Sequence, residues 1–217
     1  MDQEIEIISS ETRKEKIINF IKNKKKIIIF VIFFIILIIF SFFVYQEYNN
    51  QQREQLANKY NATIIQYETG DQSDKSSVFN LMKEIIEEKD KTYSPLAFYF
   101  LLDNDLIVSK QEINKYFDLL INELGLDREN KNLTIFKKGL FNSEFANENE
   151  LLNILNPIIK SESIWKPHAL YLMAEYYFAK KEKQKSKEFL EQLISLENIS
   201  EKIRVEAQKR LRSDFSE

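Results

Sequence analysis

One uninterrupted apolar run dominates the pattern of hydrophobic and polar positions along the chain. Residues 27–45 (IIIFVIFFIILIIFSFFVY) contain no charged side chain, and Ser41 is their only small polar residue. A helix of this length extends roughly 28 Å, which matches the hydrocarbon thickness of a bilayer. The run exceeds the apolar core of a signal peptide, and no small-residue cleavage site follows it. The pattern therefore predicts a retained transmembrane helix at residues 27–45.

Basic residues are distributed unequally on the two sides of this run. Seven lysines and arginines precede it, whereas only Arg53 and Lys59 follow within about fifteen residues. The four nearest to the span are Lys22, Lys24, Lys25 and Lys26. Because cytoplasmic flanks are richer in Lys and Arg, these lysines predict the topology. We expect residues 1–26 to form a cytoplasmic basic segment beside anionic lipid headgroups, and residues 46–217 to form an extracytoplasmic domain.

Beyond the run, apolar residues recur at intervals of three and four, which is the period of an amphipathic helix. The faces and turn signals predict helices over about 46–67, 74–89, 96–107, 110–124, 127–141, 151–155, 166–180, 184–196 and 200–212. We expect Asn156-Pro157 to end the short helix before it, and Gly125 to end the helix that Ser109 caps. The low glycine and proline content disfavours a β-domain. The chain is therefore expected to be all-α, with no strand.

The amino-acid composition excludes several common kinds of enzyme active site. Without cysteine there is no zinc ribbon or thiol nucleophile, and three glycines cannot build a glycine-rich phosphate loop. His168 is the single histidine, and next to Pro167 in a first helical turn it is interpreted as a surface or capping residue rather than a general base. Glu84, Glu87 and Glu88 fit the solvated side of an amphipathic helix. We expect no enzyme, no cofactor and no metal site.

The charge balance disfavours nucleic acid as a partner. Of the 31 basic and 34 acidic residues, 7 and 5 precede the span, so residues 46–217 contain 24 basic and 29 acidic side chains. A domain with an acidic excess is repelled by a phosphate backbone. Other proteins and the membrane lipid remain as the expected partners.

Two segments of the predicted domain share one sequence frame. The segments YSPLAFY at 93–99 and WKPHALY at 165–171 both follow aromatic-x-Pro-x-Ala-x-Tyr, 72 residues apart. The spacing of the 34-residue tetratricopeptide repeat is followed in the last region by Leu170, Met173, Ala174, Tyr177, Ser186 and Leu190. Small Ala174 and Ser186 would let two helices approach closely. We therefore expect four helical hairpins, at 47–89, 95–124, 127–156 and 166–196, with a capping helix at 200–212.

The predicted chain has a basic N-terminus, one span and an exported stack that ends in W-x-P-x-A…A-x-x-Y…S-x-x-x-L. This plan resembles a bacterial family of single-pass tetratricopeptide-like membrane proteins, which includes the ancillary subunit of the SecYEG translocon. The resemblance implies an α-solenoid in the periplasm, anchored in the inner membrane, that binds translocon subunits, periplasmic chaperones or exported chains. In a Gram-positive bacterium the stack would face the cell wall. The resemblance implies no catalytic residues. The chain departs from the repeat pattern at Leu170, Ser186 and Asn198, where Trp, Ala and Pro are typical.

Two functions follow as hypotheses. The leading one is a membrane-anchored protein-protein interaction scaffold in protein export or envelope assembly, and the alternative is a transmembrane regulator that signals through residues 1–26. The aromatic side chains exceed what a thin helical stack must bury, so some are expected to line a concave partner-binding groove. Packing between hairpins is the other role open to them. The predicted partner-binding residues are Tyr99, Tyr171 and Tyr176.

Overall fold

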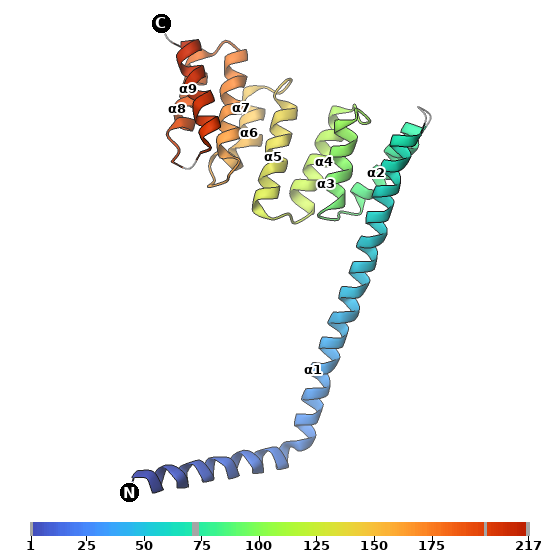
Figure 1. Cartoon of the computed structure of the whole chain (residues 1–217), viewed down its shortest axis with the longest axis vertical. Helices are drawn as coiled ribbons and strands as arrows, with labels where there is room; N and C mark the ends of the chain where they lie inside the picture. The colour runs from blue at the N-terminus through green and yellow to red at the C-terminus, as the bar shows by residue number, and fades with distance from the viewer. Residues whose placement is uncertain (1, 71–73, 198, 216–217) are drawn as a thin grey trace. The chain divides into compact units, whose positions relative to one another are not determined.

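The computed structural model describes residues 2–70, 74–197 and 199–215, and every regular element among them is a helix (Figure 1). The helices are α1 (Asp2–Thr69), α2 (Lys75–Glu87), α3 (Tyr93–Asp103), α4 (Lys110–Glu123), α5 (Arg128–Asn142), α6 (Glu148–Ile159), α7 (Lys166–Ala179), α8 (Lys183–Ile194) and α9 (Glu201–Phe215). The prediction of an all-α chain is confirmed for these residues.

The chain forms two compact units, residues 1–56 and residues 57–217. Within α1, the stretch Asn23–Thr69 is long and apolar enough to cross a membrane, and it is the one such stretch in the described part of the chain. Its apolar side chains face outward, with Phe33 61% and Phe40 67% exposed. A row of exposed aromatic and aliphatic side chains favours lipid over water as its surroundings. Length and composition thus fit one membrane-spanning helix near the N-terminus.

Side-chain caps set the start of two middle helices. At α4 the Ser109 hydroxyl accepts a hydrogen bond from the Glu112 amide at 3.3 Å. At α5 the Asp127 carboxylate accepts from two amides of the first turn, each at 3.1 Å. Such caps contribute about 1 kcal/mol each. Gly125 follows α4 with a φ of +58°, which glycine adopts without strain, so the predicted start and end of α4 are confirmed.

Helix α6 begins earlier than the predicted segment 151–155. Asn147 and Glu150 form a reciprocal capping box, in which the Asn147 side chain accepts from the Glu150 amide at 3.0 Å. The Glu150 carboxylate in turn accepts from the Asn147 amide at 2.9 Å. Because the amides of Asn147 and Glu150 are both hydrogen-bonded in this way, the helix starts at Glu148.

The end of α6 also differs from the prediction. Pro157 lies inside the helix, so Asn156-Pro157 does not end it. A proline removes one hydrogen bond to the preceding turn, but here only the last turn is affected. The Lys160 amide still donates to the Asn156 carbonyl at 3.0 Å, and Ile158 is fully buried. Burial of this side chain offsets the lost bond, and the helix continues to Ile159.

Small residues allow close helix packing at two places. The Ser186 hydroxyl of α8 donates to the Ala174 carbonyl of α7 at 2.8 Å, and both residues are buried. The predicted close approach at this pair is confirmed. On α5, a Cβ atom added to Gly139 would lie 2.4 Å from Cδ2 of Leu155 on α6. No larger residue fits there without a shift of Leu155.

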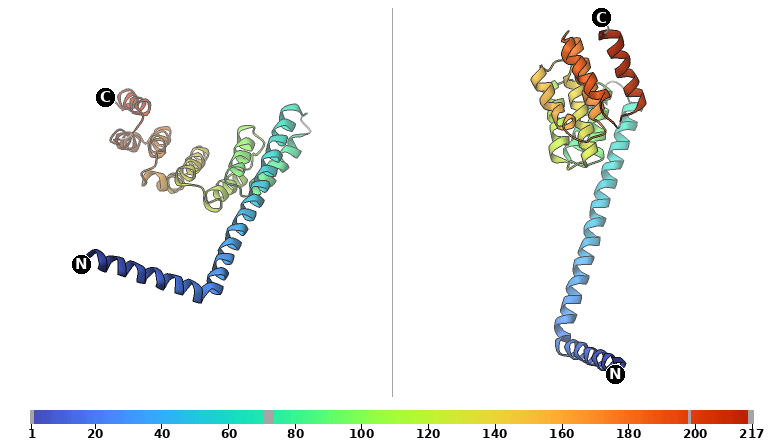
Figure 2. Two further views of the ribbon diagram at one scale, coloured as in Figure 1. Left: turned by 60° about the horizontal axis from the view of Figure 1, so that its bottom comes forward. Right: turned by 90° about the vertical axis from the view of Figure 1, so that its left-hand side faces the viewer.

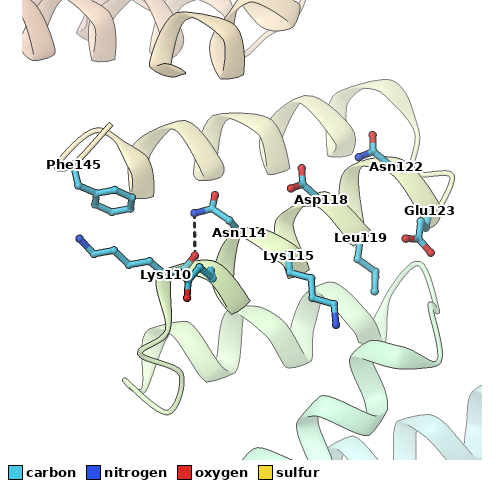
Figure 3. Close-up of a pocket in the computed structure, with 9 residues that line it drawn as sticks. Lys110, Asn114, Lys115, Asp118, Leu119, Asn122, Glu123 and Phe145 are labelled. Atoms are coloured by element: carbon cyan, nitrogen blue, oxygen red, sulfur yellow. Dashed lines mark hydrogen bonds between the residues drawn. The ribbon is translucent and has the colours of Figure 1, made fainter. Parts of the chain in front are cut away.

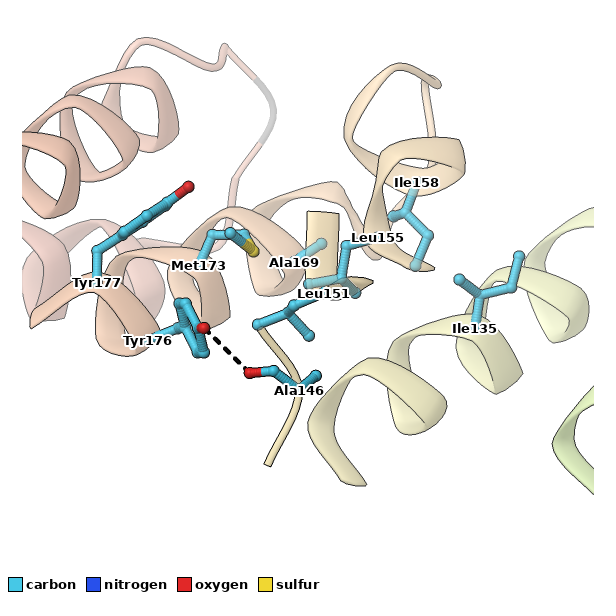
Figure 4. Close-up of a cluster of buried hydrophobic side chains, with 9 residues drawn as sticks. All are labelled: Ile135, Ala146, Leu151, Leu155, Ile158, Ala169, Met173, Tyr176 and Tyr177. Atoms are coloured by element: carbon cyan, nitrogen blue, oxygen red, sulfur yellow. Dashed lines mark hydrogen bonds between the residues drawn. The ribbon is translucent and has the colours of Figure 1, made fainter. Parts of the chain in front are cut away.

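The core between α5, α6 and α7 consists of buried aliphatic and aromatic side chains (Figure 4). Burial of each large apolar side chain contributes about 1.5–3 kcal/mol. The buried members are Ile135, Ala146, Leu151, Leu155, Ile158, Ala169, Met173, Tyr176 and Tyr177. This cluster packs α5, α6 and α7 against one another.

From α2 to α9, each helix contacts the next one along the chain, and α5 also contacts α7 (Figures 1 and 2). Ring contacts and hydrogen bonds recur at sequence separations of 33 to 35 residues. The pairs are Tyr60 with Tyr93, Tyr67 with Phe100, Tyr99 with Thr134, Glu129 with Ser163, and Glu175 with Arg210. In these five pairs, contacts between separate helices repeat at a similar interval along the sequence.

Candidate functional site

A cavity of about 690 Å³ is formed by α5, α7 and the start of α9, and we name it the α5–α7–α9 groove. Its apolar wall comes from all three helices and consists of Phe136, Leu140, Tyr171, Leu172 and Ile203. Its polar lining consists of His168, Glu175, Ser200, Lys202 and Glu206. Leu140 is 52% exposed, so the apolar wall is accessible to a ligand. An apolar surface with a few polar groups is typical of a binding site.

Tyr171, one of the predicted partner-binding residues, lines this groove and is half-buried. Burial raises the pKa of its phenol, and the carboxylates of Glu175 and Glu206 raise it further. Arg210, which is hydrogen-bonded to the phenol, lowers the pKa. The phenol therefore remains a neutral hydrogen-bonding group at neutral pH.

Arg210 of α9 binds Glu175 of α7 through two nitrogens. Its Nε and Nη2 donate to one carboxylate oxygen at 2.9 and 2.7 Å, and Nη2 donates to the other at 2.6 Å. The guanidinium also lies 4.8 Å from the ring centre of Phe178. Charge-assisted bonds of this kind fix orientation as well as adding energy. The pair neutralises Glu175 and holds α9 against α7 at the groove.

The two other charged residues of the lining, Lys202 and Glu206, are exposed. In the described part of the chain, neither has a hydrogen-bond or ion-pair partner. They lie four residues apart on α9, which places them one helical turn from each other. The groove therefore has one available cation and one available anion along its α9 side.

His168 differs from the surface or capping residue that was expected. Its ring is half-buried at the groove, with ring centres 5.8 Å from Phe136 and 5.3 Å from Trp165. Phe136 and Trp165 stack on each other at 5.9 Å. Among the described residues, the buried Nδ1 of His168 has no hydrogen-bond partner. Aromatic packing rather than capping thus positions this imidazole.

Tyr99 lies outside the α5–α7–α9 groove. Its hydroxyl is 3.3 Å from the Thr134 hydroxyl, and the Lys137 ammonium lies 3.6 Å from its ring centre. Burial raises the pKa of the phenol. The half-buried ring is a contact between α3 and α5 that leaves part of its surface accessible.

Tyr176 lies in the core, and its prediction as a groove residue is corrected. The side chain is only 7% exposed, and its hydroxyl donates to the Ala146 carbonyl at 3.1 Å (Figure 4). The ring packs against Tyr177 at 5.7 Å between ring centres. A partner could reach it only if α6 and α7 separated.

A second cavity, of about 730 Å³, follows the exposed side of α4 and reaches Phe145 (Figure 3). Several of its polar groups are already paired within the chain. Asn114 donates to the Lys110 carbonyl at 3.0 Å, and Asp118 accepts from Lys138 at 2.7 Å. The Lys110 ammonium lies 3.8 Å from the ring centre of Phe145. These internal pairings make the second cavity a weaker candidate than the α5–α7–α9 groove.

The acidic residues and the flanking lysines occupy exposed positions. Glu84, Glu87 and Glu88 are exposed, and Glu84 pairs with Lys59. In the described part of the chain, no cluster of three His, Asp or Glu side chains is arranged to hold a metal ion. Of the lysines predicted to set the topology, Lys24, Lys25 and Lys26 are exposed on α1, whereas the side chain of Lys22 lies outside the described residues.

Sequence reasoning identified Tyr171 but not its neighbours in the groove. Phe136, Leu140 and Leu172 have the spacing of core residues, and nothing in their pattern marks them as accessible. Lys202 and Glu206 look like ordinary solvated charges of a terminal helix. Two contacts hold α9 beside α7: Ala207 is buried in one cluster with Leu170 and Ala174, and Arg210 pairs with Glu175, 35 residues away.

Comparisons of the chain with protein-family models, with curated proteins and with solved structures give no match.

Proposed function

We propose that the chain is a membrane-anchored protein-protein interaction scaffold, in which a tetratricopeptide-like stack of helical hairpins binds polypeptide partners through the α5–α7–α9 groove. The four hairpins are the end of α1 with α2, α3 with α4, α5 with α6, and α7 with α8, and α9 is the cap. A single helix, α1, provides the membrane anchor.

The observation that carries this proposal is the contact spacing of 33 to 35 residues from Tyr60 to Arg210. It is close to the 34-residue length of the tetratricopeptide repeat. The helices α3, α5, α7 and α9 begin 35, 38 and 35 residues apart, which supports the same repeating unit. Stacks of this kind bind extended partners on the surface formed by alternate helices. The groove is formed by three alternate helices, α5, α7 and α9.

The proposed location is the bacterial inner membrane, with residues 1–26 in the cytoplasm and residues 46–217 in the periplasm. The excess of lysine before the span supports this orientation. The resemblance to the single-pass family of the SecYEG ancillary subunit supports a role in protein export or envelope assembly. Translocon subunits, periplasmic chaperones and exported chains are the partners it suggests.

Photocrosslinking in bacterial cells tests this function. A photoreactive amino acid is placed at Tyr171 or Leu140 in the groove, at Tyr99 outside it, and at the exposed Glu87 of α2 as control. The adducts are identified by mass spectrometry. A shared set of protein adducts from Tyr171 and Leu140, absent from Glu87, is the expected result.

Two other outcomes contradict the proposal. Equal adducts from the groove and from Glu87 would mean non-specific contact. Complete absence of adducts from Tyr171 and Leu140, in a correctly inserted protein, would exclude the groove as a binding site. Deletion of residues 2–16 then examines the alternative, a regulator that signals through its N-terminal segment.

A further inference from the structure

The charges at the α5–α7–α9 groove narrow the class of polypeptide that it accepts. Apolar side chains of α5 and α7 form its wall, whereas α9 supplies both unpaired charges, Lys202 and Glu206. Glu175 is already neutralised by Arg210. The charge selectivity of the groove therefore depends on Lys202 and Glu206.

Glu206 and Tyr171 line the same groove, and the Glu206 carboxylate is one of the charges that raise the pKa of the phenol. A ligand cation at this position would meet the carboxylate, and it could also contact the face of the tyrosine ring. Comparable arrangements occur elsewhere in this domain, where Lys185 pairs with Glu148 and lies 5.0 Å from the Tyr177 ring centre. The surroundings of Glu206 thus favour a lysine or arginine of the ligand.

Lys202 limits how many cations the ligand can have. It lies four residues before Glu206, about 6 Å along the helix axis. A second basic residue of the ligand would approach this ammonium and be repelled. The groove therefore favours one basic residue among apolar ones over a polybasic segment. The acidic excess of residues 46–217, with 24 basic and 29 acidic side chains, favours a cationic ligand overall.

We propose that the groove binds an apolar stretch of polypeptide with a single lysine or arginine, whose cation pairs with Glu206. The inference rests on the proposed function, since it names the ligand class of the same groove. The apolar residues of the ligand cover Phe136, Leu140 and Leu172, and the basic residue sets the position of the peptide along α9.

Trp165 supplies a direct signal for binding. It is the only tryptophan of the chain, and it stacks on Phe136 and contacts His168, both of which line the groove. A peptide that covers Phe136 changes the surroundings of the indole and hence its fluorescence. Peptides without aromatic residues add no fluorescence of their own to the Trp165 emission.

The test uses the full chain in phosphatidylcholine nanodiscs, with empty discs as the blank. Three peptides are titrated while Trp165 emission is recorded. The first is acetyl-Gly-Gln-Leu-Leu-Lys-Leu-Gln-Gly-amide, the second has Glu in place of Lys, and the third has Ser in place of each Leu. We expect saturable binding of the first peptide and weaker binding of the other two.

Two variants assign the effect to the groove. Glu206→Gln keeps the size of the side chain and should weaken binding of the lysine peptide about two- to fivefold, the range of exposed ion pairs. Glu201→Gln on the same helix, outside the groove lining, should leave binding unchanged. Both residues are exposed, so neither variant is expected to disturb folding.

The outcomes separate this inference from the proposed function. Equal binding of the lysine and glutamate peptides, or an unchanged affinity in Glu206→Gln, would overturn the charge preference and leave the groove as a peptide site. Absence of any emission change with all three peptides would overturn the inference as well. The photocrosslinks from Tyr171 and Leu140 decide the proposed function independently of these peptides.

Discussion

Lys185 of α8 forms a direct ion pair with Glu148 of α6, two helices earlier in the chain. Its ammonium lies 2.9 and 2.8 Å from the two carboxylate oxygens. The Tyr177 hydroxyl of α7 donates to the same carboxylate at 2.8 Å. Three consecutive helices therefore meet at Glu148. Both partners lower the pKa of this carboxyl below its ordinary value of 4.5, with Lys185 the larger cause.

The first prediction concerns the acid sensitivity of this junction. A carboxyl whose folded pKa is lowered stabilises the fold above its ordinary pKa, and this contribution is lost as the pH falls through the folded pKa. The difference in stability between the native chain and Glu148→Gln should thus be largest above the ordinary pKa of 4.5 and decline as the pH falls through the lowered folded pKa. Thermal unfolding followed by circular dichroism across this range measures it. Exposed Glu144→Gln is the matched control, and a pH-independent difference for Glu148→Gln would contradict the assignment.

The second prediction concerns Gly139. Replacing a helical glycine by alanine normally stabilises a helix by about 1 kcal/mol. Here the new methyl would lie 2.4 Å from Cδ2 of Leu155, which is fully buried. We expect Gly139→Ala to destabilise the fold by about 1–3 kcal/mol, because overpacking exceeds the gain in helix propensity.

A double-mutant cycle identifies the cause. Leu155→Ala alone should cost about 2–5 kcal/mol through the cavity it leaves. The double variant should lose less stability than the two single losses combined, because the added methyl occupies part of that cavity. Additive losses in urea unfolding would show that the two residues do not limit each other.

The third prediction distinguishes the roles of Tyr171 and Tyr176, which both lie in α7. Tyr176 is buried and hydrogen-bonded to Ala146, whereas Tyr171 is half-buried in the groove wall. Tyr176→Phe should cost about 1 kcal/mol, and Tyr176→Ala about 3–5 kcal/mol. Tyr171→Ala should cost less than Tyr176→Ala and should reduce partner crosslinking from Leu140. A larger stability loss at Tyr171 than at Tyr176 would reverse their assigned roles.

The fourth prediction concerns membrane topology. The native sequence has no cysteine, so one introduced cysteine provides a unique label. Asn23 and Asn50 lie on opposite sides of the span and are exposed. A membrane-impermeant maleimide should label Asn50→Cys in intact spheroplasts and Asn23→Cys only after lysis. Replacing Lys22, Lys24, Lys25 and Lys26 by glutamine should mix the two orientations. Labelling of Asn23→Cys in intact cells would reverse the proposed topology.

The helices could be predicted from the sequence because the spacing of apolar residues and the positions of turn residues indicate the same helix boundaries along most of the chain. Ser109 and Gly125 mark the ends of α4 in both sequence and structure. The sequence pattern predicts too short a helix α6, because Asn156-Pro157 is typical of a helix end, although a proline in a last turn removes only one hydrogen bond. Its true start depends on the Asn147–Glu150 capping box.

The candidate site could be predicted only in part. The spacing of apolar residues assigns Tyr171 and Tyr176 to one helix. Because they are five residues apart, they lie on different faces of it, Tyr171 at the groove and Tyr176 in the core. Only the position of α6 shows that Tyr176 is covered. The groove itself requires α9 to lie beside α7, which depends on the burial of Ala207 against Leu170 and Ala174 and on the pairing of Arg210 with Glu175. Contacts between distant segments of this kind leave no periodic trace in a single sequence.

The contacts from α2 to α9 connect mainly consecutive helices, and this order has a consequence for how the domain unfolds. A domain with one shared core loses its structure in a single step, whereas a linear array can come apart from either end. Fraying should start at α9, which has a helix on one side only. Since α9 forms one side of the groove, detachment of this last helix would abolish ligand capture while the rest of the array stays folded. Loss of binding in denaturant should therefore precede loss of helicity.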